Sequence, residues 1–177
     1  MNSEPDAPTP TDEAVVTAQL GRAPRGDWWV EARCGFGYPQ VVATPPILDD
    51  DTPFPTLYWL SCPWLMAVVS TIESEGGVAY WAARLAADRE LFDRLLRADE
   101  EYRARRAALV PAGPDPFGQV GIAGQRDPAA TKCLHAHVAT ALAGIDDPVG
   151  AELLAALGHE CPDGRCASLT CLREEDS

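Results

Sequence analysis

The first third of the chain alternates short apolar runs with glycine and proline. Residues 27–33 (DWWVEAR), 40–44 (QVVAT) and 57–60 (LYWL) are rich in aromatic and β-branched side chains, which favour a pleated strand. The intervening residues 34–39 (CGFGYP) contain two glycines and a proline, as expected of a hairpin-like connection. The pattern therefore predicts short strands that pair in an antiparallel sheet.

From residue 63 onward the apolar positions recur at helical spacing. Pro63 at the start and the glycines 76–77 at the end bracket a helix over 63–75, because proline suits the first turn and glycine ends a helix. Caps and periodicity predict further helices over residues 78–86, 88–109, 127–144 and 147–157. The fold class is therefore α+β, a small antiparallel sheet from the N-terminal third covered by about five helices.

Both ends of the chain differ from this middle part. Residues 1–20 begin with an acidic, proline-rich stretch, which cannot bury enough apolar surface to offset the entropy of ordering. We expect a disordered N-terminal segment over 1–20, in which 14–20 could form a short helix or lie against the domain. We further expect a single domain over 21–158 and an acidic tail over 159–177 that contains three cysteines.

The long helix over 88–109 carries many charges of both signs. Phe92, Leu95, Tyr102 and Leu109, with Leu85 just before the helix, form an apolar stripe. The opposite face carries arginines at 94, 97, 103, 105 and 106 against acidic residues at 93, 99, 100 and 101. Such a face is typically solvated and held by pairs four residues apart. The alternatives are a surface for a partner helix or an arginine cluster for an anionic ligand.

Composition narrows the class of protein. The chain has 177 residues and a formal net charge of −13. Nucleic acid and anionic membranes are therefore poor partners, because each requires a basic footprint. No apolar run reaches the roughly 18 residues of a membrane span. The acidic N-terminus is unlike a secretory signal, so we expect a cytoplasmic protein whose six cysteines are reduced.

The candidate chemistry centres on Cys133, His135 and His137 in the run KCLHAH. Thiolate and imidazole bind Zn²⁺ and other transition metals. In a regular helix, Cys133 and His137 share a face because they are four residues apart. If the turn is not yet regular at Cys133, His135 is the better partner, and the spacing leaves both open.

Two donors do not complete a metal site. A structural zinc usually has four ligands, and Cys34 and Cys62, each beside a turn signal, could supply the others. The opposing interpretation is that these thiols are ordinary small apolar groups of the core, since the chain has no CxxC pair.

Three other segments invite interpretation. The acidic run 49–51 fails the pattern of a calcium loop, because the positions that need glycine and glutamate hold Phe54 and Leu60. The glycine-rich run 117–124 could present free N–H groups to an anion or simply be a flexible loop. In the tail, His159, Cys161 and Cys166 could bind a metal loosely, but a polar tail with incidental thiols is the simpler interpretation.

Several runs of residues together resemble a known family. They are residues 33–39 (RCGFGYP), residues 52–63 (TPFPTLYWLSCP), residues 132–135 (KCLH) and residues 147–150 (DPVG). These runs resemble the bacterial domain of unknown function 501 family over roughly residues 20–157. The resemblance implies counterparts of Cys34, Cys62, Cys133 and His135, and it favours His135 over His137. It implies no activity.

Three functions follow as hypotheses. The first is a cytoplasmic domain with a structural or redox metal site, holding zinc or another transition metal with Cys34, Cys62, Cys133 and His135 or His137. The second is an enzyme that uses a thiolate at Cys133 with a histidine base, or an open metal position. The third is an interaction module for an unknown protein partner, in which the cysteines belong to the core.

Overall fold

The computed structural model describes residues 8–48 and 52–171. It is an α+β fold with a three-stranded antiparallel sheet, formed by β1 (Trp29–Arg33), β2 (Pro39–Ala43) and β3 (Tyr58–Leu60) in the order β1-β2-β3. The predicted fold class is confirmed. The acidic run 49–51, which does not fit the pattern of a calcium loop, lies outside the described residues.

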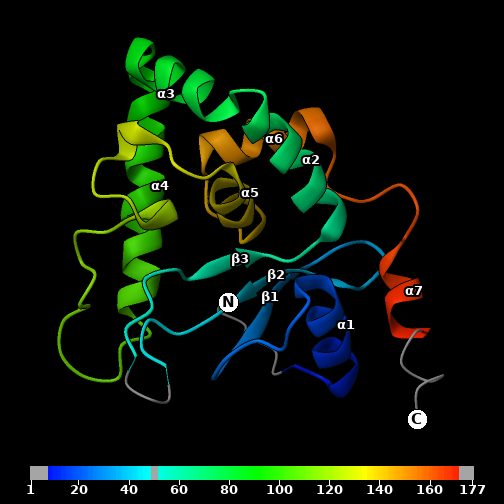
Figure 1. Ribbon diagram of the computed structural model, residues 1–177. Coiled ribbons are helices and arrows are strands. Elements are labelled where there is room, and N and C mark those ends of the chain that lie inside the picture. The colour runs from blue at the N-terminus through cyan, green and yellow to red at the C-terminus, as the bar shows by residue number, and fades with distance from the viewer. Residues whose placement is uncertain (1–7, 49–51, 172–177) are drawn as a thin grey trace.

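Helices cover the sheet unequally (Figure 1). In the described chain the α-helices are α1 (Pro10–Leu20), α2 (Pro63–Ser74), α3 (Gly77–Ala87), α4 (Arg89–Ala107), α5 (Leu134–Leu142), α6 (Pro148–Leu157) and α7 (Cys166–Cys171). Two short 3₁₀ segments, η1 (Ile122–Gly124) and η2 (Pro128–Ala130), precede α5. Helices α2 to α6 gather over one face, whereas α1 lies across the other face with α7 beside it.

The register of the sheet decides which side chains face the helices. Val41 pairs with Leu60 and Ala43 with Tyr58, while Val42 pairs with Trp59 between them. Because successive side chains in a strand point to opposite faces, Leu60 and Tyr58 enter the helical core and Trp59 points away from it. Tyr58 accordingly packs edge-on against Tyr102 of α4, with ring centroids 5.8 Å apart.

Residues 10–20 are helical, although the sequence favoured disorder over 1–20. Thr9 and Asp12 form a reciprocal capping box at the start of α1. The Asp12 carboxylate also pairs with Arg33 of β1 at 2.6 Å, and this pair holds the pKa of Asp12 well below its ordinary range. Val15 and Val16 are buried. The ion pair and the two valines attach α1 to the sheet.

The helix predicted over 127–144 begins later than expected. Asp127 caps only the short segment η2, by accepting the N–H of Ala129 at 3.0 Å. Thr131 then leaves the helical path with φ of 16° and ψ of 108°. The α-helix starts at Leu134, so Cys133 is its N-cap residue, with extended backbone.

Helices α5 and α6 approach each other very closely at Gly150. A methyl group at this position would overlap the main-chain carbonyl of His137. The two helices are further joined by a hydrogen bond of 2.7 Å between His137 Nδ1 and Asp147 Oδ2. Asp147 Oδ1 in turn accepts the first free N–H groups of α6, from Val149 and Gly150.

One arginine of α4 is entirely buried, which the sequence did not predict. Arg106 was placed on the solvated face, but its side chain is 0% exposed. It pairs with the buried Asp115 at 2.9 Å and donates to the carbonyls of Pro55, Phe117 and Val120. Arg106 thereby ties the loop after α4 to the segment before β3.

We expect Arg106→Ala to lower the free energy of unfolding by about 3–5 kcal/mol, because it leaves the buried Asp115 charge and several carbonyls without a partner. Chemical denaturation measures this change. Arg97→Ala, at an exposed position of the same helix, is the control and should change stability by no more than about 0.5 kcal/mol. Equal effects of the two substitutions would contradict the role given to Arg106.

Candidate metal site

Two helix ends converge on one group of potential ligands. Glu73 lies in the last turn of α2, Cys133 is the N-cap of α5, and His135 lies in the first turn of α5. Their ligating atoms all lie within 4.8 Å of one another. The group is partly exposed, with 16% of the His135 side chain and 25% of the Glu73 side chain accessible. Solvent and a dissolved ion can therefore reach it.

His135 is the centre of the group. Its Nδ1 atom lies 3.8 Å from Cys133 Sγ and 3.3 Å from Glu73 Oε1. Zinc bonds of ordinary length at tetrahedral angles separate a nitrogen from an oxygen ligand by about 3.4 Å, and from a sulfur ligand by about 3.6 Å. The observed separations are close to both values. The three side chains could therefore hold a metal ion with little rearrangement.

The other ring nitrogen of His135 is fixed by α2. Nε2 lies 3.1 Å from the Met66 carbonyl oxygen and 3.2 Å from Ser70 Oγ. A hydrogen bond from Nε2 to the Met66 carbonyl leaves Nδ1 free to carry a lone pair toward a metal. Metal-binding histidines commonly have such a partner on the second nitrogen, because it fixes the tautomer and the ring orientation.

Besides being a potential metal ligand, Glu73 has a structural role. Its Oε1 atom accepts the backbone N–H of Leu134 at 2.6 Å. The first N–H groups of a helix have no partner within it, and a carboxylate is favoured there by the helix dipole. Glu73 thus caps α5 from another helix and holds its own oxygen beside His135.

The same contacts perturb the protonation of His135. Its pKa is raised from 6.5 to about 9, chiefly by the Cys133 sulfur beside the ring. Burial opposes this change, and the Met66 carbonyl and the Glu73 carboxylate add to it. A metal ion must therefore displace a proton from His135 when it binds near neutral pH.

His137 does not join this group. It is 2% exposed and its Nδ1 bonds Asp147. Because α5 starts only at Leu134, Cys133 is not yet in the regular helix that would have aligned it with His137. The alternative that the spacing left open, His135 as the partner of Cys133, is the one that the structure forms.

Cys34 and Cys62 lie elsewhere, near the C-terminal segment. Cys62, at the start of α2, is buried, and the pKa of its thiol is raised by burial and further by the nearby sulfurs of Cys166 and Cys161. The pKa of Cys166 is likewise raised by burial first, with contributions from Cys161 and Cys34. In the part of the chain that the structure describes, Glu73, Cys133 and His135 are the only set of three or more His, Cys, Asp or Glu residues whose potential ligand atoms all lie within 4.8 Å of one another. The structure therefore does not bring Cys34 and Cys62 to Cys133.

The C-terminal segment is packed, not a detached tail. Glu160 Oε1 accepts the N–H of Gly35 at 2.7 Å, and the His159 carbonyl accepts a hydrogen bond from the Gln40 side chain. Cys161 and Cys166 are 6% and 4% exposed. These contacts hold the segment against the β1–β2 hairpin, so its two buried thiols are packed within the fold.

The glycine-rich run 117–124 has no free row of N–H donors. The N–H groups of Gly118, Val120, Gly121 and Gly124 bond carbonyls within the loop, and that of Ile122 bonds the Asp99 carboxylate at 2.9 Å. The proposed anion cradle is therefore not formed. Four arginines of α4 besides Arg106 are also paired with acidic side chains, namely Arg89, Arg94, Arg103 and Arg105.

Sequence reasoning missed Glu73. It is one of 27 acidic residues, it lies 60 positions from Cys133, and no motif joins the two. The one available signal was its place in the last turn of a predicted helix, where the dipole disfavours a carboxylate. An acidic residue at that position suggests a partner outside the helix, which here is the N–H of Leu134.

Comparison with known proteins gives one match. Residues 30–155 match the family model described as "Protein of unknown function (DUF501)", which confirms the resemblance drawn from the motifs. All three residues of the candidate site lie within the matched range. Searches of curated proteins and of solved structures find no match. Among the described residues, no helix has the length and apolar character needed to cross a membrane.

We predict that His135 titrates near pH 9 in the metal-free protein. Cys133→Ala should lower this pKa most, and Glu73→Gln should lower it less, because the sulfur is the larger cause. Histidine ring NMR over a pH series measures both effects. Glu75→Gln, which changes an exposed acidic residue at the C-cap of α2, is the control. The raised pKa stabilises the fold fully below about pH 6.5 and this contribution is lost as the pH rises through about 9. A titration near 6.5 in the unsubstituted protein would contradict the geometry described.

Proposed function

From the premise that this chain belongs to the family described as "Protein of unknown function (DUF501)", we propose that it is a Zn²⁺-binding protein. Glu73, Cys133 and His135 supply the ligands. The observation that supports this most directly is the pair of separations, 3.3 Å and 3.8 Å, that place an oxygen and a sulfur around one imidazole nitrogen. Both are close to the spacing of ligands around tetrahedral zinc.

The kind of donor favours zinc over other ions. Ca²⁺ and Mg²⁺ prefer oxygen ligands, whereas this group offers one sulfur, one nitrogen and one oxygen. Such mixed sets suit Zn²⁺ and neighbouring transition metals. The sulfur would bind as a thiolate, and His135 as a neutral imidazole through Nδ1.

Three protein ligands leave the fourth position of a tetrahedral ion to water. Structural zinc sites are normally closed by four protein ligands, whereas sites with three keep an exchangeable position. The partial exposure of Glu73 and His135 fits a water in that position. We therefore favour an open site over the closed structural site expected from sequence, and an open site can act as a Lewis acid.

The reduced state of Cys133 that zinc requires suits the cytoplasm, which we retain as the proposed location. A protein partner also remains a proposal. Because most α4 arginines are paired within the chain, that helix has little free positive charge with which to bind a protein partner.

The second candidate function is nucleophilic catalysis by Cys133. The sulfur lies 3.8 Å from His135 Nδ1, and this contact is the main reason for the raised pKa of His135. A thiolate beside an imidazolium is the arrangement of cysteine nucleophiles. Because both functions would use the same atoms, they are distinguished by whether a metal ion is required.

We expect the purified chain, without a histidine tag, to bind about one equivalent of Zn²⁺. Cys133→Ala and His135→Ala should weaken binding by more than about a hundredfold, since they remove a ligand rather than a neighbouring group. Elemental analysis and competition with a chromophoric chelator measure stoichiometry and affinity. Glu73→Gln should weaken binding less, because an amide oxygen keeps the hydrogen bond from Leu134 but carries no charge.

Matched controls separate this site from the other thiols. His159→Ala and Glu75→Gln change an exposed histidine and an exposed glutamate, and both should retain zinc. Cys34→Ser should retain it as well. Loss of zinc in Cys34→Ser together with its retention in Cys133→Ala would place the metal at the other cysteines and overturn the proposal.

Alkylation distinguishes the two candidate functions. If zinc occupies the site, iodoacetamide should modify Cys133 at least about tenfold more slowly with zinc than after chelation, because the metal occupies the thiolate lone pair. Peptide mass spectrometry follows Cys133 directly, and the partly exposed Cys34 reports general reactivity. Rapid alkylation of Cys133 that zinc leaves unchanged would favour the thiolate enzyme.

A further inference from the structure

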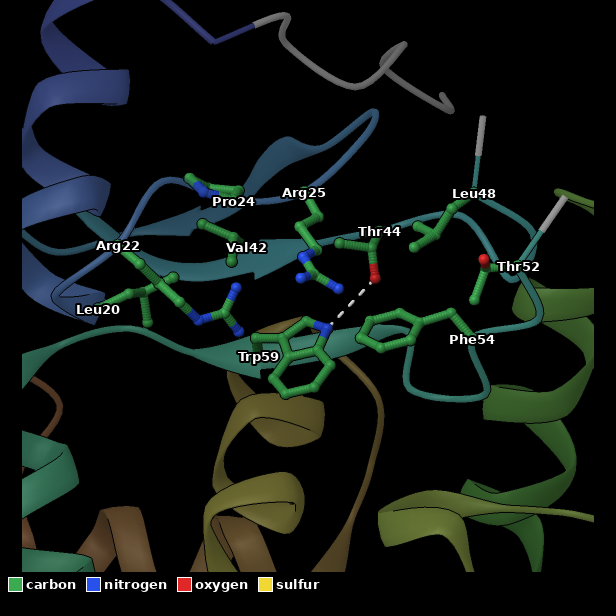
Figure 2. A pocket seen from close by; sticks show the side chains of 10 residues that line it. All are labelled: Leu20, Arg22, Pro24, Arg25, Val42, Thr44, Leu48, Thr52, Phe54 and Trp59. Atoms are coloured by element: carbon green, nitrogen blue, oxygen red, sulfur yellow. Dashed lines mark hydrogen bonds between the residues drawn. The ribbon is translucent and has the colours of Figure 1, made fainter. Parts of the chain in front are cut away.

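A pocket of about 440 Å³ lies on the face of the sheet opposite the candidate metal site. Figure 2 shows it between the connection that follows α1 and the strands β2 and β3. The residues that line it are Leu20, Arg22, Pro24, Arg25, Val42, Thr44, Leu48, Thr52, Phe54 and Trp59. Its volume falls in the range of about 300–1,000 Å³ that is typical of small-molecule sites.

Two stacked aromatic side chains form the floor of the pocket. Trp59 and Phe54 stack with ring centroids 5.2 Å apart and planes 15° apart. Trp59 points to this side because its neighbours in β3 enter the helical core. Its indole N–H donates to Thr44 Oγ1 at 3.2 Å, and that hydroxyl donates to the Thr56 carbonyl at 3.1 Å. The ring orientation is therefore fixed, and these polar atoms are already satisfied.

Two arginines provide the charge. Figure 2 shows the guanidinium groups of Arg22 and Arg25 directed over the floor, toward Trp59. Both side chains are exposed. Within residues 8–48 and 52–171, neither has an ion-pair or hydrogen-bond partner. Among the described residues that line the pocket, none is acidic, although the chain as a whole carries a net charge of −13.

The contrast with the other arginines is informative. Five arginines of α4 form ion pairs with acidic side chains and are neutralised within the fold, whereas Arg22 and Arg25 face an apolar cavity. Guanidinium groups recognise carboxylate and phosphate through paired hydrogen bonds. Aromatic side chains accept a further planar ring by stacking or by edge contact.

We propose that this pocket binds a small organic anion with a planar aromatic body and a carboxylate or phosphate head group. The ring packs against the stacked pair of Trp59 and Phe54, and the head group pairs with Arg22 and Arg25. Because Trp59 Nε1 and Thr44 Oγ1 are engaged with each other, the floor selects by shape and apolar contact. It offers no free hydrogen-bonding group to the edge of the ligand ring.

This site is independent of the metal site. It shares no residue with Glu73, Cys133 and His135, and its strand residues Val42 and Trp59 point to the face of the sheet opposite the helical core. Binding should therefore persist after zinc is removed with a chelator, so a failure of either proposal leaves the other testable.

Four probes separate the two halves of the proposed ligand. They are 1-naphthyl phosphate, 1-naphthoate, 1-naphthol and inorganic phosphate, titrated by calorimetry into the full chain. The two aromatic anions should bind at least about tenfold more tightly than naphthol or phosphate alone, which corresponds to one good charged contact. The ratio of the affinities for 1-naphthyl phosphate and 1-naphthoate identifies the preferred head group.

Variants test the named residues. Arg22→Ala and Arg25→Ala should each weaken binding of the preferred anion by about tenfold while leaving naphthol binding unchanged. Trp59→Leu should weaken the binding of all aromatic probes. Trp59→Phe should retain most of the affinity, because it keeps a planar ring. Arg97→Ala, at an exposed position of α4, should bind the probes as the unsubstituted protein does. Circular dichroism should show that each variant is folded.

Two results would overturn the proposal. One is equal affinity for naphthol and for the aromatic anions, which would make the arginines irrelevant. The other is unchanged affinity in both arginine variants, which would place the anion elsewhere on the chain.

Discussion

The hydrogen bond from the Leu134 N–H to Glu73 Oε1, at 2.6 Å, is the contact on which the candidate metal site depends. It joins the end of α2 to the start of α5, two helix termini that would otherwise have unmatched dipoles. With α5 anchored there, Cys133 and His135 face the carboxylate that caps their helix. His135 then reaches back to the Met66 carbonyl of α2, so the ligands and their supports form one closed set of contacts.

Much of the fold follows from local pattern, and much of the site does not. The strands and the helices α2, α3, α4 and α6 are marked by β-branched runs, helical spacing, prolines and glycines. The start of α5 is not, because Asp127 caps a short 3₁₀ turn equally well and Thr131 then leaves the helical path. That local detail decides between His135 and His137 as the partner of Cys133.

Long-range contacts explain the remaining differences. Glu73 has no sequence link to Cys133, and Cys34 and Cys62 were expected there because nothing in the sequence places the C-terminal cysteines beside them. Arg106 looked like one more charge on a solvated face. Its burial depends on the carbonyls of Pro55, Phe117 and Val120, which come from segments without periodicity. The alternation in β3, by contrast, suffices to send Trp59 and its neighbours to opposite faces.

The close packing of α5 on α6 has a consequence for motion. With no side chain at Gly150 and a hydrogen bond from His137 to Asp147, α5 cannot slide or tilt without breaking its contact with α6. Helix α2 meets α5 through Glu73, which accepts the Leu134 N–H, and through the Met66 carbonyl and the Ser70 hydroxyl beside His135. Of the three candidate ligands, only the Glu73 carboxylate belongs to a helix outside this α5–α6 contact, so we expect it, rather than His135, to shift when an ion enters or leaves.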